Sequence, residues 1–219
     1  MTLDFIQIIY EEYQREKCYP FATIHKNETC TVFFENSVIA DLVPKSSADL
    51  IGICSWRLSQ KRGDMFRLAD KTLSREKILA HDFDVAILTP RGHIDIRTKL
   101  MHWHPRRETE MALEHFGKFT PFPETVRRSI YENHFIARGE IYKRYIDESL
   151  LPAIRHINSS PKVYMVNAKY INRKLGDERK AADKLLASWG RTDYPLAPFI
   201  LERLFSIWIS DQNIKVIDL

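Results

Sequence analysis

Three short apolar runs in the first half of the chain alternate with helical patterns, and this alternation restricts the fold more than any other feature. The runs cover residues 3–10, 49–55 and 84–89, and each is short and rich in apolar, often β-branched residues. Helical patterns at residues 34–44 and 74–80 separate them. Such alternation is typical of an α/β domain with a mainly parallel sheet covered by helices.

The remainder of the chain extends this pattern within one expected domain, residues 1–219. We expect further helices over residues 106–116, 139–157 and 196–209, and further strands over residues 129–138 and 214–218. In the helix at 34–44, Asn36 or Ser37 is the expected N-cap and Pro44 the end. Lysine and arginine dominate residues 161–192, which we interpret as a basic helical insertion or subdomain edge.

Glycine usage excludes two common nucleotide-binding motifs. The chain has only 7 glycines and contains neither GxGxxG nor GxxxxGK[ST], so the Rossmann fingerprint and the P-loop are both absent from it. A formal net charge of +4 does not indicate a nucleic-acid partner. The three cysteines Cys18, Cys30 and Cys54 fit neither a disulfide framework nor a zinc pattern.

No apolar run approaches the length of a membrane span, and Asp4, Glu11 and Glu12 interrupt any signal-peptide pattern at the N-terminus. A cytoplasmic protein with at most peripheral membrane contact is therefore expected. The basic segment 162–184 is interpreted as a solvated face, with the binding of a lipid-linked phosphate at a membrane surface as the alternative.

Basic and aromatic residues follow two of the predicted strands, where parallel sheets bind their ligands. Trp56, Arg57 and Lys61 follow the strand at 49–55, and Arg91 and Asp95 follow the strand at 84–89. A guanidinium next to an indole suits a phosphate joined to a planar or sugar ring. Arg91 could offset the charge of a diphosphate, and Asp95 could hold a divalent cation. The structural alternative is a pair of ordinary solvated loops.

Two further segments place a carboxylate among other polar or apolar groups. On a strand over 129–138, Glu132 and His134 would share one face about 7 Å apart, so the carboxylate could orient the imidazole or act as a base. Glu202 lies in the apolar helix 196–209, where a charge costs several kcal/mol unless it is paired or ligated. Adjacent helical residues do not face each other, so Arg203 is expected to point away from Glu202. The alternatives are a satisfied buried polar pair and a buried ion pair.

Two other patterns could bind metal. Asp82-Phe83-Asp84 is a DxD sequence, but it precedes its strand and should lie at the opposite edge of the sheet. His102 and His104 would share one face of a strand, although no third ligand follows at a suitable spacing. A metal-dependent hydrolase would require His93 and Asp95 to meet these two histidines.

Six segments together resemble a known family: IQIIYEE, FENSVIADL, DLIGICSWR, DFDVAILTPR, YENHFIAR and APFILERLFSIWI. In this order, across residues 5–218, they resemble glycosyltransferases of bacterial surface-polysaccharide gene clusters. FILERLFSIWI is the most specific segment. That family is similar to GT-A glycosyltransferases, which are single α/β domains with a nucleotide-sugar donor at the carboxyl edge of the sheet. The resemblance implies a hexosyltransferase-type enzyme that moves a sugar from this donor to a glycan or lipid-linked acceptor.

The resemblance also implies roles for individual residues. It places Gln7 and Tyr10 at the donor edge of the first strand, Trp56 and Arg57 beside the donor, Glu132, Asn133 and His134 under the acceptor, and Glu202 and Arg203 at the wall of the cleft. An inverting reaction would need Glu132 or Glu202 to take the acceptor proton.

The metal-binding motif of the family is not in its usual place. GT-A enzymes usually carry a DxD after a central strand, where this chain has Thr89-Pro90-Arg91. Arg57, Lys61 or Arg91 would then meet the leaving phosphates, and dependence on a divalent cation such as Mn²⁺ or Mg²⁺ stays open. The alternative to an enzyme is a non-catalytic scaffold or binding protein with the same fold. The two differ in whether the basic and acidic groups converge.

Overall fold

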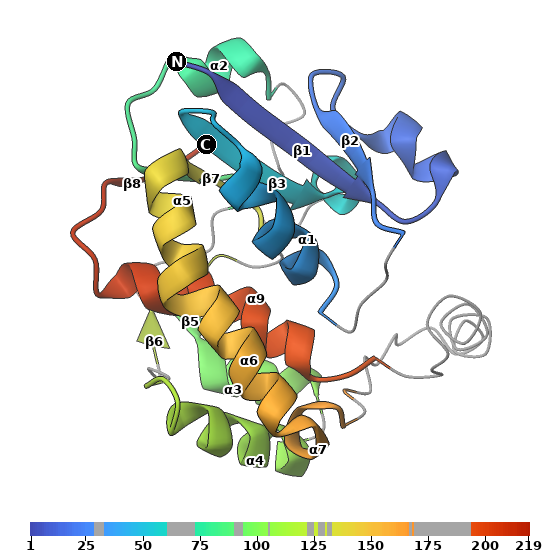
Figure 1. Cartoon of the computed structure of the whole chain (residues 1–219), viewed down its shortest axis with the longest axis vertical. Coiled ribbons are helices and arrows are strands. Elements are labelled where there is room, and N and C mark those ends of the chain that lie inside the picture. Colours follow the sequence, from blue (N-terminus) through green and yellow to red (C-terminus); the bar gives the residue numbers. More distant parts are fainter. Residues whose placement is uncertain are drawn as a thin grey trace.

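A six-stranded sheet forms the centre of the computed structural model (Figure 1). The structure describes residues 1–28, 33–60, 73–89, 94–104, 106–121, 125–126, 130, 133–166, 168 and 194–219. The strands of the sheet are β1 (Leu3–Ile9), β2 (Thr23–Lys26), β3 (Leu50–Ser55), β4 (Val85–Ile87), β7 (Phe135–Arg138) and β8 (Val216–Asp218). Their spatial order is β2-β1-β3-β7-β4-β8.

The sheet confirms the expected α/β class, and it is mixed rather than purely parallel. Strands β2, β1, β3, β4 and β8 run in one direction, whereas β7 is antiparallel to its neighbours β3 and β4. The beginning of β7 therefore lies at the same edge as the carboxyl ends of the other five strands. This reversal positions the candidate site described below.

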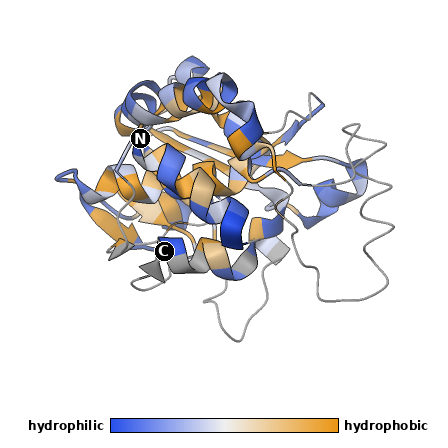
Figure 2. Cartoon of the chain, turned by 90° about the horizontal axis from the view of Figure 1, so that it is seen from below, coloured by the Kyte–Doolittle hydropathy of each residue, from blue (hydrophilic) through white to orange (hydrophobic). Residues whose placement is uncertain are grey.

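Alternation along the strands builds a separate core on each face of the sheet. Ile51 and Ile53 of β3 contribute to the larger core, while Leu50 and Cys54 of the same strand contribute to the smaller one. Both faces are apolar because helices or loops cover both (Figures 1 and 2). Helices α1 (Glu35–Leu42), α5 (Gly139–Tyr145), α6 (Leu151–Ser159) and α9 (Ala197–Ser210) supply the larger core.

The expected helix at 139–157 is present and contains a π-helical turn. A π segment, η4 (Ile146–Leu150), joins α5 to α6 with helical backbone angles at both junctions. Pro152, near the start of α6, has no N–H to donate to the preceding turn. In a wider π turn the hydrogen bond that the N–H of residue 152 would donate is not needed, which explains the π geometry of η4.

A second helical layer lies beyond α9 from the sheet. It contains α3 (Ile96–Trp103), α4 (Arg106–Gly117) and α7 (Pro161–Tyr164), with a small antiparallel pair of β5 (Ile94–Asp95) and β6 (Thr125–Val126). The buried hydroxyl of Tyr164 lies 2.8 Å from His115 Nδ1 and 2.9 Å from His156 Nε2, so one side chain ties α4, α6 and α7 together. Among the helices of the described ranges, none is both long and apolar enough to cross a bilayer.

Several local predictions are wrong in informative ways. The N-cap of α1 is Phe34, not Asn36 or Ser37, because the helix begins at Glu35. The strand predicted over 129–138 begins only at Phe135. Edge strand β2 was not predicted. None of its four residues is fully buried, and its sequence therefore lacks the alternation of apolar and polar residues by which a strand is found.

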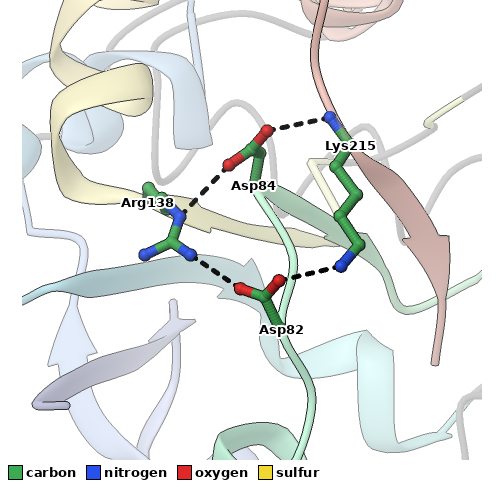
Figure 3. Close-up of polar contacts among 4 residues, drawn as sticks. All are labelled: Asp82, Asp84, Arg138 and Lys215. Carbon is green, nitrogen blue, oxygen red and sulfur yellow. Dashed lines mark hydrogen bonds and ion pairs between the residues drawn. The ribbon is translucent and has the colours of Figure 1, made fainter.

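The DxD sequence lies at the opposite edge of the sheet from the carboxyl ends, as expected, and both aspartates bind cationic groups of the protein (Figure 3). Arg138 donates from Nε to Asp84 at 3.1 Å and from Nη2 to Asp82 at 2.9 Å. The backbone N–H of Lys215 donates to Asp84 at 2.9 Å, and its ammonium donates to Asp82 at 2.8 Å. The network fixes the segment that leads into β8.

Replacing Asp84 by alanine is expected to lower the free energy of unfolding by about 1–2 kcal/mol, because it removes an acceptor shared by a backbone N–H and a guanidinium. The matched control is Asp82→Ala, which removes a carboxylate whose side chain is 75% exposed and should change stability much less. Urea unfolding of both variants measures the difference. Equal losses would contradict this account of the network.

Candidate functional site

Polar and aromatic side chains gather at the carboxyl edge of the sheet. Tyr10 directly follows β1, Trp56 and Arg57 follow β3 in the short helix η3 (Trp56–Gln60), and Thr89 follows β4. His134 joins them because β7 runs in the opposite direction and begins at this edge. The strands thus bring residues from four separate stretches of sequence to the place where α/β sheets bind ligands.

Gln7 holds the chain around this edge in position. Its side chain is fully buried, its amide oxygen accepts the backbone N–H of Tyr19 at 2.6 Å, and its amide nitrogen donates to the carbonyl of Ser55 at 3.4 Å. These contacts connect β1 to the segment before β2 and to the end of β3. The residue predicted to contact a donor therefore lies beside the site, with its amide engaged by the backbone.

Aromatic and cationic groups alternate on the surface formed after β1 and β3. The ammonium of Lys17 lies 4.8 Å from the ring centre of Tyr13 and 5.2 Å from that of Trp56. The guanidinium of Arg57 lies 5.8 Å from the same Trp56 ring and is exposed to solvent. Cation–π contacts of this kind orient cations beside an aromatic face. Trp56 and Arg57 lie beside each other, with Lys17 and Tyr13 next to them, and their contact with a donor stays a prediction.

Glu35 lies at the centre of the charged groups of this edge. Burial raises the pKa of Glu35 above its ordinary value, and the negative charge of Glu202 raises it further. The backbone N–H at Glu35, the neighbouring Tyr10 side chain and the positive charge of Arg57 lower this pKa in turn. Arg57 and Glu35 also act on the pKa of Tyr194, which burial raises. Side chains from the segment after β1, from η3 and from α9 therefore act on Glu35 in the first turn of α1.

Glu202 forms an ion pair within its own helix. Its carboxylate lies 2.6 Å from Nη1 of Arg203, which also donates to the carbonyl of Phe199 at 3.0 Å. The prediction that Arg203 points away from Glu202 is wrong. With side chains only 15% and 9% exposed, the two charges are stabilised by bending towards each other, and their long side chains allow this despite their adjacency.

The segment before β7 brings Asn133 and His134 into the interior of the same edge. Both are buried, and His134 Nδ1 lies 3.5 Å from the hydroxyl of Thr89. Asn133 donates to the side chain of Asn36 at 3.4 Å, which connects this segment to the first turn of α1. Because Asn133 has a φ of 56°, the backbone turns here, and the predicted strand does not continue through this residue.

Some predicted residues lie outside the described part of the chain. They are Glu132, Lys61 and Arg91, together with His93 and most of the basic segment 161–192. Asp95 is described only as a backbone position in β5. The expected proximity of Glu132 and His134, and the phosphate contacts of Lys61 and Arg91, stay predictions.

The histidine pair does not have the predicted geometry. His102 lies in helix α3, not on a strand, and His104 follows that helix. His104 is buried against the ring of Phe199, and its Nδ1 lies 3.0 Å from the carbonyl of Ala168. Within the described ranges, no three histidine, cysteine, aspartate or glutamate side chains come close enough together to hold a metal ion.

Sequence analysis missed Glu35 and Tyr194 as members of the site. Glu35 stands in the first turn of α1, where an acidic residue is usual for helix electrostatics alone. Tyr194 stands just before α9, and its ring packs 5.7 Å from that of Phe34. One feature of the sequence could have indicated Glu35: this carboxylate stands between Phe34 and the apolar residues of α1.

Comparison with known proteins adds no relative: no family model, curated protein or solved structure matches this chain. Function is therefore inferred from the geometry of the site.

Proposed function

We propose that this protein is a GT-A-like glycosyltransferase that moves a sugar from a nucleotide-sugar donor to a glycan or lipid-linked acceptor in surface-polysaccharide synthesis. The observation that carries the proposal is the convergence of Arg57, Glu202 and Tyr10 on Glu35 at the carboxyl edge of the sheet. A cation and two carboxylates from three distant stretches of sequence lie there together. A non-catalytic scaffold has no need to bring such groups together in partly buried surroundings.

The surface after β1 and β3 supports a donor with a diphosphate and a flat ring. Arg57 presents a planar guanidinium, which suits the oxygens of a phosphate, and Lys17 adds a second positive charge. The exposed ring of Tyr13 and the half-buried ring of Trp56 offer faces for a base or sugar. In this arrangement Arg57 stabilises the charge that grows on the leaving diphosphate.

The described residues do not fit the metal site usual in GT-A enzymes. Thr89 stands where the family has its DxD, and the DxD of this chain binds Arg138 and Lys215 at the other end of β4. The positive charge of Arg57 acts on the carboxylate of Glu35 and lowers its pKa. We therefore derive no step of the reaction through a metal.

A thermal-shift panel tests the proposal. Uridine, guanosine, adenosine and cytidine diphosphates are added to the full chain, each with and without Mn²⁺. We expect at least one nucleotide to raise the unfolding midpoint, because a ligand at 100 times its Kd stabilises the folded state by about 2.7 kcal/mol. No shift across the whole panel would overturn the proposal and favour a non-catalytic scaffold or binding protein.

Replacing Arg57 by alanine is expected to weaken binding of that nucleoside diphosphate about 10- to 100-fold, since a charge-assisted hydrogen bond contributes about 1.5–3 kcal/mol. Isothermal titration measures the Kd. Arg144→Ala is the matched control, because Arg144 also lies over a tryptophan ring, that of Trp208, and belongs to helix α5 outside the cluster. If both variants bind like the wild type, Arg57 has no part in donor binding.

A further inference from the structure

We propose that Glu35 is the catalytic base that accepts the proton of the acceptor hydroxyl. This assignment rests on the proposed transferase function, and it differs from the two candidates that the sequence suggested, Glu132 and Glu202. It follows from the position of Glu35, from the backbone that holds it, and from the charges around it.

Position distinguishes Glu35 from Glu202. Glu202 is already engaged at 2.6 Å by Arg203, whose guanidinium is itself fixed by the carbonyl of Phe199. A carboxylate held in this way is a poor proton acceptor, because protonation would leave a buried arginine without its counter-charge. Glu35 instead lies among Tyr10, Arg57 and Glu202 and keeps part of its surface exposed. Both carboxylates are half-buried, so the engagement of Glu202 by Arg203 is what leaves Glu35 to accept the proton.

The backbone around Glu35 is strained. In the described residues, two non-glycine positions have positive φ angles: Phe34 at 51°, directly before Glu35, and Asn133 at 56°. A positive φ at a bulky aromatic residue is a rare outlier, and such strain costs about 1–3 kcal/mol. The hydrogen bond between Asn133 and Asn36 joins the two strained segments. The fold thus holds the first turn of α1 in an unfavourable conformation, as is common where a side chain must be aimed.

The charges around Glu35 favour its action as a proton acceptor. Desolvation and the charge of Glu202 raise its pKa, whereas Tyr10 and Arg57 limit the rise. A base is most effective when its pKa lies close to the working pH, so a raised value strengthens it as a proton acceptor. Glu202 has a defined part in this arrangement: it is a positioning residue that acts on the reaction through its effect on Glu35.

The reaction balances with these groups alone. The acceptor oxygen attacks the anomeric carbon and forms the new glycosidic bond, while its proton passes to the carboxylate of Glu35. The bond between the anomeric carbon and the phosphate oxygen breaks, and its electron pair leaves with the nucleoside diphosphate beside Arg57. Attack and departure on opposite sides of one carbon invert its configuration. Glu35 returns its proton to solvent after the product leaves.

The test compares turnover with binding in Glu35→Gln, a variant of the same shape that cannot accept a proton. The full chain is supplied with UDP-glucose, UDP-N-acetylglucosamine and GDP-mannose, and release of the nucleoside diphosphate is measured with water or simple glycosides as acceptors. We expect kcat to fall about 10²- to 10⁴-fold while the Kd of the nucleoside diphosphate stays within about threefold. Glu140→Gln is the matched control, since Glu140 is an exposed glutamate in the first turn of α5 and should turn over like the wild type.

The pH profile separates proton transfer from a purely structural role. Only the carboxylate form of Glu35 accepts a proton, so kcat/KM should rise with pH, with a midpoint above the ordinary glutamate pKa of 4.5. In Glu202→Gln the neighbouring negative charge is gone, so this midpoint should move to lower pH. A merely structural Glu202 would change stability without moving the midpoint. Thermal unfolding of each variant confirms that it is folded.

The outcomes separate the transferase function from the assignment of Glu35 as its base. A wild-type protein that binds no nucleoside diphosphate and turns over no donor overturns the transferase function itself. Binding without turnover of any of the three donors overturns the catalytic role and favours a binding protein. Turnover that survives in Glu35→Gln, loss of nucleotide binding in that variant, or a product of retained configuration by NMR overturns the assignment of Glu35 and leaves the transferase function standing.

Discussion

Acidification from pH 7 to pH 4 is expected to lower the free energy of unfolding by up to about 3 kcal/mol through His104 alone. Burial lowers the pKa of this histidine from 6.5 to about 4, and the nearby charge of Arg203 acts in the same direction, whereas the hydrogen bond with Ala168 opposes it. His104 is therefore neutral in the folded protein and protonated in the unfolded chain between these two values. Each pKa unit corresponds to about 1.36 kcal/mol.

The sign of this effect follows from proton uptake. Between pH 6.5 and pH 4 the unfolded chain binds a proton at His104 that the folded protein does not bind, so stability falls as the pH falls. The same holds for His156, whose pKa is also lowered, first by desolvation and then by His115. Above pH 7 neither histidine contributes to a pH dependence.

Urea unfolding at pH 7, 6, 5 and 4 measures the prediction, with His104→Asn as the decisive variant. Its amide can still donate to the carbonyl of Ala168 but cannot titrate, so the decline of stability with falling pH should be about 3 kcal/mol smaller than in the wild type. His81→Asn, which replaces an exposed histidine, serves as the control. A decline as steep in His104→Asn as in the wild type would exclude His104 as its source.

Most of the sheet was predictable because its strands are buried on both faces. The runs at β1, β3 and β4 are mostly apolar and largely buried, so length and β-branched composition were enough to find them. Strand direction was not predictable in the same way. Nothing in the side chains of β7 distinguishes an antiparallel neighbour from a parallel one, because Phe135, Ile136 and Ala137 are buried in either case.

The site was only partly predictable for a related reason. Arg57 and Glu202 were found because each is conspicuous in its own segment, after a strand or within an apolar helix, and Tyr10 was found through the family resemblance. Glu35 can be recognised only in the folded structure, where its neighbours come from distant parts of the sequence. Its importance comes from Glu202, 167 positions later, and from a positive φ at Phe34, and neither can be deduced from a helix N-terminus that looks ordinary in sequence.

The pairing of Glu202 with Arg203 shows a limit of the helical spacing rule. Adjacent residues of a helix point in directions about 100° apart, which normally keeps their side chains separate. Here both side chains are nearly buried, so the cost of leaving either charge alone outweighs the cost of bending two long side chains together. Burial, which sequence patterns give only approximately, decided the geometry.

Replacing Gly139 by alanine is expected to lower the free energy of unfolding by about 2–3 kcal/mol. The added Cβ would lie 2.5 Å from the carbonyl oxygen of Ala48, a backbone atom that cannot move aside like a side chain. The backbone N–H of Gly139 also donates to the carbonyl of Asp49 at 2.8 Å, so relief of the clash would stretch this bond. The two contacts fasten the turn from β7 into α5 against the segment that leads into β3.

Gly117→Ala is the control that separates this clash from a general effect of replacing glycine. A Cβ at Gly117, the last residue of α4, meets no atom within 4 Å, so the variant should be neutral or more stable by up to about 1 kcal/mol through reduced chain entropy. Urea unfolding of both variants gives the comparison, and similar stabilities would refute the clash. Because Gly139 lies at the opposite edge of the sheet from Arg57 and Glu35, the folded fraction of Gly139→Ala should still bind a nucleoside diphosphate with the affinity of the wild type.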